Sequence, residues 1–129
     1  QKLIAVKIKK CQRELLIINC YCPPNEDIEP AMSAIGNILQ KFADIKTIIM
    51  GDFNSKHEIW GSTETDEKGE KVLEFIVLHN LTLVNVKELP LTFKTTRARG
   101  WIDLTISDTN LYQDIKSWEV LKDYNHSDH

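Results

Sequence analysis

Apolar residues fall into short runs along the first part of this chain. Residues 3–9 and 14–21 are two such runs, and the polar stretch 10–13 between them predicts a pair of strands joined by a turn. The second run contains four consecutive apolar residues, which is typical of a strand covered on both faces. A further apolar run at 45–50 predicts a central strand.

Two other segments have helical periodicity. In residues 31–42 and 68–79, apolar side chains recur every three or four positions, and Asn80 resembles a C-terminal cap for the second helix. Further strands are expected at 81–85, 92–94, 101–107 and 115–120, with 92–94 pairing with 101–107. This order of elements predicts a single α/β domain over residues 1–129, with a mixed sheet covered by helices.

Composition narrows the class of protein. The chain has 129 residues, of which 42% are hydrophobic and 27% charged, as in ordinary globular domains, and no apolar run is long enough to span a bilayer. The net charge of −3 excludes an overall positive field, so any contact with nucleic acid must use local basic patches.

The three cysteines have no spacing typical of a disulfide framework. Cys20 and Cys22 are interpreted as two small apolar residues on one buried face of a strand, rather than as a metal or redox site. Unpaired thiols favour a reducing, intracellular compartment.

The strongest candidate for chemistry is Gly51-Asp52-Phe53-Asn54, which follows the apolar run 45–50. On extended chain Asp52 and Asn54 would project from the same face, and Gly51 would let the backbone turn close to a substrate. A carboxylate here can orient a water molecule and accept its proton, while an amide can hold that carboxylate or a phosphate. A plain turn is the alternative, because Gly, Asp and Asn are turn formers.

A second acid and an imidazole close the chain in Ser127-Asp128-His129. His129 could donate a hydrogen bond to a developing oxyanion, and Asp103 is a candidate partner that would fix the tautomer of the imidazole. Asp103 interrupts an apolar segment, where a lone carboxylate is costly unless it is paired. Taken alone, the C-terminal triplet is equally consistent with a solvated terminus.

Weaker signals come from Tyr21, His57 and Trp60. The phenol of Tyr21 could bind a phosphate oxygen, although a core tyrosine is the simpler interpretation. His57 is expected to make a local hydrogen bond, and Trp60 to anchor a loop on the core. The segment 94–100 is a basic hairpin tip that is either a solvated loop or, in a nuclease, a wedge for a DNA groove. Its basic residues are Lys94, Arg97 and Arg99.

Together these motifs resemble a known family. In chain order they are Asn19-Cys20-Tyr21-Cys22-Pro23-Pro24-Asn25, Gly51-Asp52-Phe53-Asn54-Ser55-Lys56-His57, Trp60-Gly61, Gly69, Leu73-Glu74-Phe75, Leu81-Thr82-Leu83-Val84-Asn85, Leu91-Thr92-Phe93, Ile102-Asp103-Leu104-Thr105 and Ser127-Asp128-His129. The chain resembles the apurinic/apyrimidinic-endonuclease-like endonuclease domain of non-LTR retrotransposons, within the exonuclease-endonuclease-phosphatase superfamily. The resemblance implies a four-layered α/β sandwich, of which this chain would lack the N-terminal strands and the last strand.

The resemblance also implies an activity. It is a Mg²⁺-dependent (or Mn²⁺-dependent) nick in double-stranded DNA, whose freed 3′-hydroxyl primes reverse transcription. A reverse transcriptase domain in the same parent polypeptide, action in the nucleus and no membrane contact are implied as well. Because the family's metal-binding Glu and an active-site Asn lie on earlier strands, this chain alone is expected to be weakly active or inactive.

Residue roles follow from the same resemblance, position by position. The implied catalytic residues are Tyr21 as a phosphate-binding phenol, Asp52 as the group that orients the attacking water, Asn54 as its support, and Asp103 paired with His129. Asp52 and Asp128 are the implied metal ligands. The implied phosphate- or substrate-binding residues are Asn25, Thr92, Ser127, Lys94, Arg97 and Arg99.

Two other functions stay open at this point. Another phosphoesterase of the superfamily, such as a phosphatase or an RNA deadenylase, would share the Gly-Asp and Asp-His motifs, although Lys56-His57, Trp60-Gly61 and Leu91-Thr92-Phe93 argue against it. The second open function is that of a non-catalytic remnant that only binds DNA. The intact catalytic positions count against it.

Overall fold

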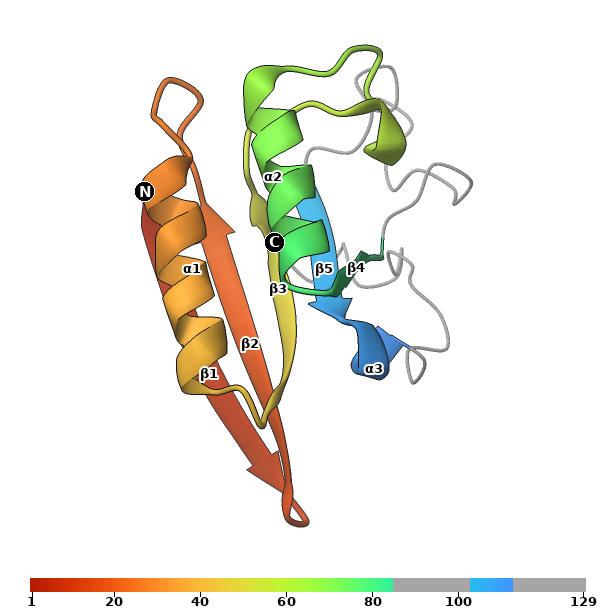
Figure 1. Ribbon diagram of the computed structural model, residues 1–129. Coiled ribbons are helices and arrows are strands. Elements are labelled where there is room, and N and C mark those ends of the chain that lie inside the picture. Colours follow the sequence, from red (N-terminus) through yellow and green to blue (C-terminus); the bar gives the residue numbers. More distant parts are fainter. Residues whose placement is uncertain (85–102, 113–129) are drawn as a thin grey trace, which may run out of the picture.

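The structure is a computed structural model that describes residues 1–84 and 103–112 (Figure 1). Its elements in chain order are β1 (Lys2–Lys10), β2 (Arg13–Tyr21), α1 (Glu29–Lys41), β3 (Lys46–Asp52), the 3₁₀ helix η1 (Glu58–Trp60), α2 (Glu67–Leu78), β4 (Leu81–Leu83), β5 (Asp103–Asp108) and the single-turn helix α3 (Thr109–Tyr112).

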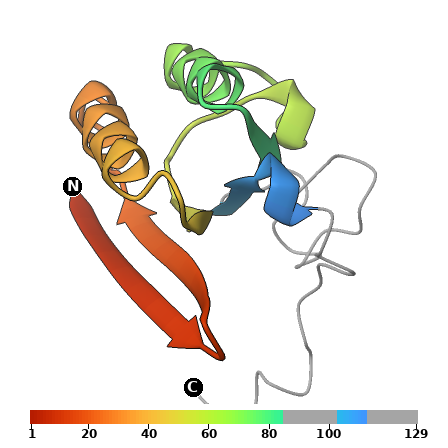
Figure 2. The ribbon, with the colours of Figure 1, turned by 60° about the horizontal axis from the view of Figure 1, so that its bottom comes forward.

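The described strands form one mixed sheet in the order β1-β2-β3-β5-β4. Only the β2–β3 pair is parallel, and the other three pairs are antiparallel. Two parallel neighbours need a crossover connection, which α1 supplies here. Helices α1 and α2 both lie on one side of the sheet, as Figure 2 shows. The predicted mixed sheet covered by helices is therefore confirmed.

The two faces of the sheet differ in burial. The face of β2 that carries Ile18 and Cys20 is buried beneath the helices, and Ile35 of α1 packs into the same core. On β1 the opposite face stays open, since Ile4 is 64% exposed and Val6 49% exposed. Because side chains alternate along a strand, this burial assigns each strand residue to the helix-covered face or to the open face.

Most predicted elements are found, with shifted ends. Helix α1 begins at Glu29, before the expected start at residue 31, because Pro30 sits in its first turn, where its missing N–H costs no helical hydrogen bond. Strand β3 continues to Asp52 and does not stop at residue 50 as expected, because Gly51 still pairs with Cys20 on one side and Leu104 on the other. The η1 and α3 helices were not expected.

Several predictions fall outside the described residues. These are the strands at 92–94 and 115–120, the end of the strand predicted at 81–85, the basic tip 94–100 and the C-terminal triplet. Among the described helices, none combines the length and the hydrophobicity needed to cross a bilayer.

The β1–β2 hairpin has an unusual turn for its sequence. Cys11 and Gln12 have φ angles of 52° and 66°, and they join the paired residues Lys10 and Arg13 as a two-residue turn. Two positive φ angles in such a loop define a type I′ turn, for which Asn-Gly is strongly preferred. The turn therefore carries backbone strain in its present sequence.

We expect the double substitution Cys11→Asn, Gln12→Gly to stabilise the fold by about 1 kcal/mol, because these residues adopt positive φ at lower cost. Urea unfolding followed by circular dichroism measures the change. Cys11→Ser is the matched control, since serine keeps the unfavourable backbone requirement. An unfolding midpoint for the double variant at or below that of Cys11→Ser contradicts the strained turn.

Candidate functional site

Strand register brings three of the predicted site residues together. Tyr21 on β2 is directly opposite Asp52 on β3, and Asp52 is directly opposite Asp103 on β5. Opposed residues in neighbouring strands have Cβ atoms about 5 Å apart. Tyr21, Asp52 and Asp103 thus form one row across the ends of three adjacent strands, although they lie far apart in the sequence.

This row belongs to the open face of the sheet. Tyr21 is 42% exposed, whereas its neighbour Cys20 is buried on the helix side. The interpretation of Tyr21 as a core residue is wrong, because strand alternation turns its side chain away from the helices. Asp52 is half-buried and Asp103 is exposed, so a substrate can reach all three side chains.

Asn54 takes a different position from the one expected. Its φ of 46° is left-handed, so the expected extended backbone through Asn54 is wrong. The Asn54 backbone N–H donates to Asp52 Oδ1 at 3.0 Å, and its Nδ2 donates to the Cys22 carbonyl at 2.7 Å. Cys22 N–H in turn donates to the Asp52 carbonyl at 2.9 Å. Asn54 therefore holds the Asp52 carboxylate and ties the ends of β2 and β3 together.

The loop after Asn54 is anchored from two sides. Trp60 is fully buried, and its indole N–H donates to the Ser55 carbonyl at 3.2 Å. The Asp66 carboxylate caps α2 by accepting from Gly69 N–H at 2.7 Å, and the same oxygen accepts from Lys56 N–H at 3.0 Å. One side chain thus fixes both the start of α2 and the chain just after Asn54.

His57 and Trp60 behave as the sequence suggested. His57 Nδ1 accepts a hydrogen bond from Ile59 N–H at 3.0 Å, which confirms a local role for this imidazole. Burial of Trp60 confirms it as the anchor of its loop. Asn25 lies exposed in the turn that follows β2.

The two carboxylates of the row interact unfavourably. Partial desolvation of the Asp103 carboxyl raises its pKa, and the neighbouring Asp52 raises it further. Such a carboxyl favours folding when it is protonated, and this contribution is lost as the pH rises through its folded-state pKa. At neutral pH the repulsion between these two carboxylates therefore opposes folding.

We expect Asp103→Asn to raise the free energy of unfolding at pH 7 by less than about 1 kcal/mol, because the side chain is partly exposed. The difference should vanish below about pH 3.9, where an unfolded-state aspartate is also protonated. Urea titrations at the two pH values measure it. Asp44→Asn, in the connection between α1 and β3, makes the same charge change outside the sheet. Equal pH dependence in both variants contradicts the coupling to Asp52.

The other predicted site residues lie outside the described residues. They are Thr92, Lys94, Arg97, Arg99, Ser127, Asp128 and His129. Within residues 1–84 and 103–112, no group of three or more His, Cys, Asp or Glu side chains is arranged to hold a metal ion. Asp52 and Asp103 offer the hard oxygen ligands that Mg²⁺ prefers, so they fit part of a magnesium site.

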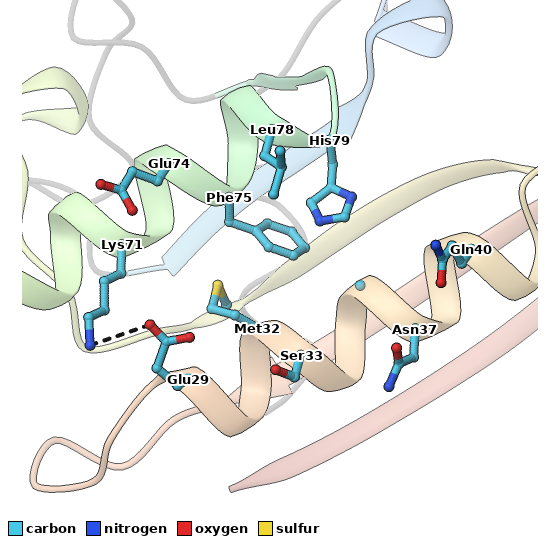
Figure 3. A pocket seen from close by; sticks show the side chains of 11 residues that line it. Glu29, Met32, Ser33, Asn37, Gln40, Lys71, Glu74, Phe75, Leu78 and His79 are labelled. Carbon is cyan, nitrogen blue, oxygen red and sulfur yellow. Dashed lines mark ion pairs between the residues drawn. The ribbon is translucent and has the colours of Figure 1, made fainter.

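A cavity on the helical side of the sheet is separate from this row. It encloses about 370 Å³ between α1 and α2, and Figure 3 shows the ion pair at its edge, Lys71 Nζ to Glu29 Oε2 at 3.4 Å. Phe75 and His79 line it, with their rings tilted by 42° and the ring centroids 4.3 Å apart. None of the predicted site residues lines this cavity, so the open face carries the candidate chemistry.

Sequence reasoning missed two contributors to the site. Asp66 could have been found, because an aspartate directly before a helix is a typical N-cap. Cys22 acts through its backbone N–H and carbonyl, and no residue type signals a backbone role.

Comparison with known proteins identifies relatives of the chain. The family profile described as Endonuclease-reverse transcriptase matches residues 15–129. No curated protein sequence matches this chain. Among solved structures, the endonuclease domain of TRAS1, a telomere-specific non-LTR retrotransposon, is similar with a TM-score of 0.75 and 25% identity. That match covers 86% of this chain and 52% of the TRAS1 chain, so this chain spans about half of that domain.

More distant structures share the fold. An endonuclease/exonuclease/phosphatase family protein from Bacteroides thetaiotaomicron has a TM-score of 0.55 at 14% identity, over 78% of this chain and 37% of its own. The human Nocturnin catalytic domain has a TM-score of 0.54 at 20% identity, over 82% of this chain and 40% of its own. The predicted α/β fold of the exonuclease-endonuclease-phosphatase type is confirmed, as a partial domain.

Proposed function

This chain belongs to the endonuclease-reverse transcriptase family, and we propose that it supplies part of the active site of a metal-dependent DNA endonuclease from a non-LTR retrotransposon. The row of Tyr21, Asp52 and Asp103 carries the proposal, because three strands place polar side chains of the right chemistry on one accessible face. The similarity to the TRAS1 endonuclease domain supports the same assignment.

Each residue has a distinct role in phosphodiester hydrolysis. Asp52 orients the attacking water and accepts its proton, and the Asn54 backbone N–H fixes the carboxylate for this task. The Tyr21 phenol donates a hydrogen bond to a non-bridging phosphate oxygen. Asp103 orients the imidazole of His129, which binds the scissile phosphate.

A divalent cation supplies positive charge that neutralises the phosphate as it is attacked. We assign Mg²⁺ or Mn²⁺ to this role, with Asp52 and Asp128 among its ligands. The crowded charges of Asp52 and Asp103 support a cation here, since it would offset their repulsion. Phosphate contacts are assigned to Asn25, Thr92 and Ser127, and DNA contacts to Lys94, Arg97 and Arg99.

The nicked strand would present a 3′-hydroxyl for target-primed reverse transcription in the nucleus. The family description supports a reverse transcriptase in the same polypeptide. Because this chain spans 52% of the TRAS1 domain, the remaining metal ligands are assigned to flanking residues of the parent polypeptide. The 129-residue chain alone should then give no nicking above that of its Asp52→Ala variant.

The deciding experiment uses the chain extended by its flanking residues to the length of the TRAS1 domain. We expect it to convert supercoiled plasmid to the open-circular form with Mg²⁺, and to stop when EDTA removes the metal. An inositol polyphosphate and a polyadenylated RNA are offered in parallel. Phosphate release from the first or shortening of the second, without nicking, overturns the DNA endonuclease in favour of another phosphoesterase. Slower migration of DNA in a native gel, without nicking, favours a remnant that only binds DNA.

A further inference from the structure

Two thiols lie in contact beside the row of site residues. Cys20 is in β2 and Cys22 follows directly after the strand, so they flank Tyr21 in the sequence. Their sulfur atoms are 3.6 Å apart, and the residues are 1% and 2% exposed. Burial agrees with their interpretation as small apolar residues, but burial alone does not explain why the two sulfur atoms are in contact.

The surroundings of the pair are fixed by a lysine from α2. Lys68 Nζ donates to the carbonyls of Pro23 at 3.2 Å and Pro24 at 3.4 Å, the two residues directly after Cys22. The two sulfur atoms are thus held in contact at the end of β2.

We propose that Cys20 and Cys22 are a redox modification site, which a small hydroperoxide oxidises to an intramolecular disulfide. One of the two sulfurs attacks one peroxide oxygen, the O–O bond breaks, and a sulfenic acid and one water (or alcohol) form. The other sulfur then attacks the sulfenic sulfur, the S–O bond breaks, and hydroxide leaves with the proton of the second thiol as water. The thiols lose two electrons and two protons in total, and the peroxide is reduced.

Disulfide formation favours a shorter backbone distance across Tyr21. Extended residues two positions apart have Cα atoms about 6.6–6.8 Å apart, which is the upper end of the range of about 4.4–6.8 Å usual for disulfide-bonded residues, most of which lie at about 5.5–6 Å. The ends of this segment are tied to the catalytic turn, since Cys22 N–H donates to the Asp52 carbonyl and the Cys22 carbonyl accepts from Asn54. We therefore expect oxidation to draw Cys20 and Cys22 together and to shift Tyr21 relative to Asp52. This consequence rests on the proposed function of the row.

Burial sets the order in which the thiols react. Cys11 is exposed in the β1–β2 turn, whereas the pair is covered by the core and reacts only during local opening of the fold. A thiol-alkylating reagent such as iodoacetamide, applied to the native protein, should therefore modify Cys11 first. The pair then reacts with hydrogen peroxide as a unit.

Peptide mass measures the modification without any assay of activity. Trypsin cuts after Arg13 and Lys41 and at no site between them, so residues 14–41 form one peptide that holds Cys20 and Cys22 but not Cys11. After treatment of the native 129-residue chain with hydrogen peroxide, we expect this peptide to lose two hydrogens, and dithiothreitol to restore them. Cys11→Ser should behave identically, while Cys20→Ser should not lose the two hydrogens.

Two results overturn the modification site. One is a peptide that keeps both free thiols while Cys11 is oxidised. The other is direct passage to sulfinic acid without a disulfide.

The effect on activity is a separate measurement on the extended domain. Peroxide should lower its nicking rate at least tenfold, and dithiothreitol should restore the rate. The Cys20→Ser variant should nick DNA at the same rate with and without peroxide treatment. A disulfide that forms with no change in nicking overturns the coupling to the row. An extended domain that never nicks DNA contradicts the proposed function, while the peptide mass still decides the modification site.

Discussion

Replacing Asp52 with asparagine is expected to lower the nicking rate of the extended domain by about 10²- to 10⁴-fold, the usual contribution of a positioned general base. Asparagine has nearly the same shape, and its Oδ1 can still accept the hydrogen bond from Asn54 N–H that Asp52 Oδ1 accepts at 3.0 Å. The turn should thus stay folded while the side chain loses its charge and its ability to accept a proton from water.

The measurement is the initial rate of open-circular plasmid formation, with urea unfolding as the check on folding. Asp108→Asn, at the other end of β5, is the matched control because it makes the same charge change in a strand that contributes Asp103 to the row. A variant that retains folding and nicks DNA within threefold of the wild-type rate removes Asp52 from the catalytic role.

Local pattern was sufficient for the elements around this site. The apolar run at 45–50 predicted β3, and the helical spacing of residues 31–42 and 68–79 predicted α1 and α2. Those signals are local, because each depends only on which faces of one element are buried. The ends of the elements depend on neighbours instead: β3 reaches Asp52 because Gly51 pairs with strands on both sides.

The arrangement of the site depends on contacts that periodicity does not encode. Alternation predicts which face a strand residue occupies, but not that Tyr21 is opposite Asp52 or that Asp52 is opposite Asp103. Asn54 has a left-handed backbone, and its side-chain amide donates to a carbonyl 32 residues earlier in the chain. Only the family resemblance linked Tyr21, Asp52 and Asp103 in advance, because it carries three-dimensional information that a single sequence pattern lacks.

At Gly51, the pairing of β2 with β3 next to the site residues depends on the absence of a side chain. Its φ is 156°, and an added Cβ would lie 1.9 Å from the Cys20 carbonyl oxygen and 2.9 Å from Cys20 N. Backbone atoms of a paired strand cannot move aside as the end of a flexible side chain can. Any residue larger than glycine must therefore separate β2 from β3 next to the Tyr21–Asp52 pair.

We expect Gly51→Ala to lower the free energy of unfolding by about 3 kcal/mol or more, because it combines a buried clash with a strained backbone. Gly36→Ala is the matched control: Gly36 lies in α1, and an added Cβ would meet the His79 ring at an ordinary 3.5 Å. Alanine is the better helix former, so this variant should gain up to about 1 kcal/mol. Urea unfolding of both variants tests the contrast. If Gly51→Ala unfolds within about 1 kcal/mol of the wild type, then β2 and β3 do not approach at Gly51 as closely as the register of the row requires.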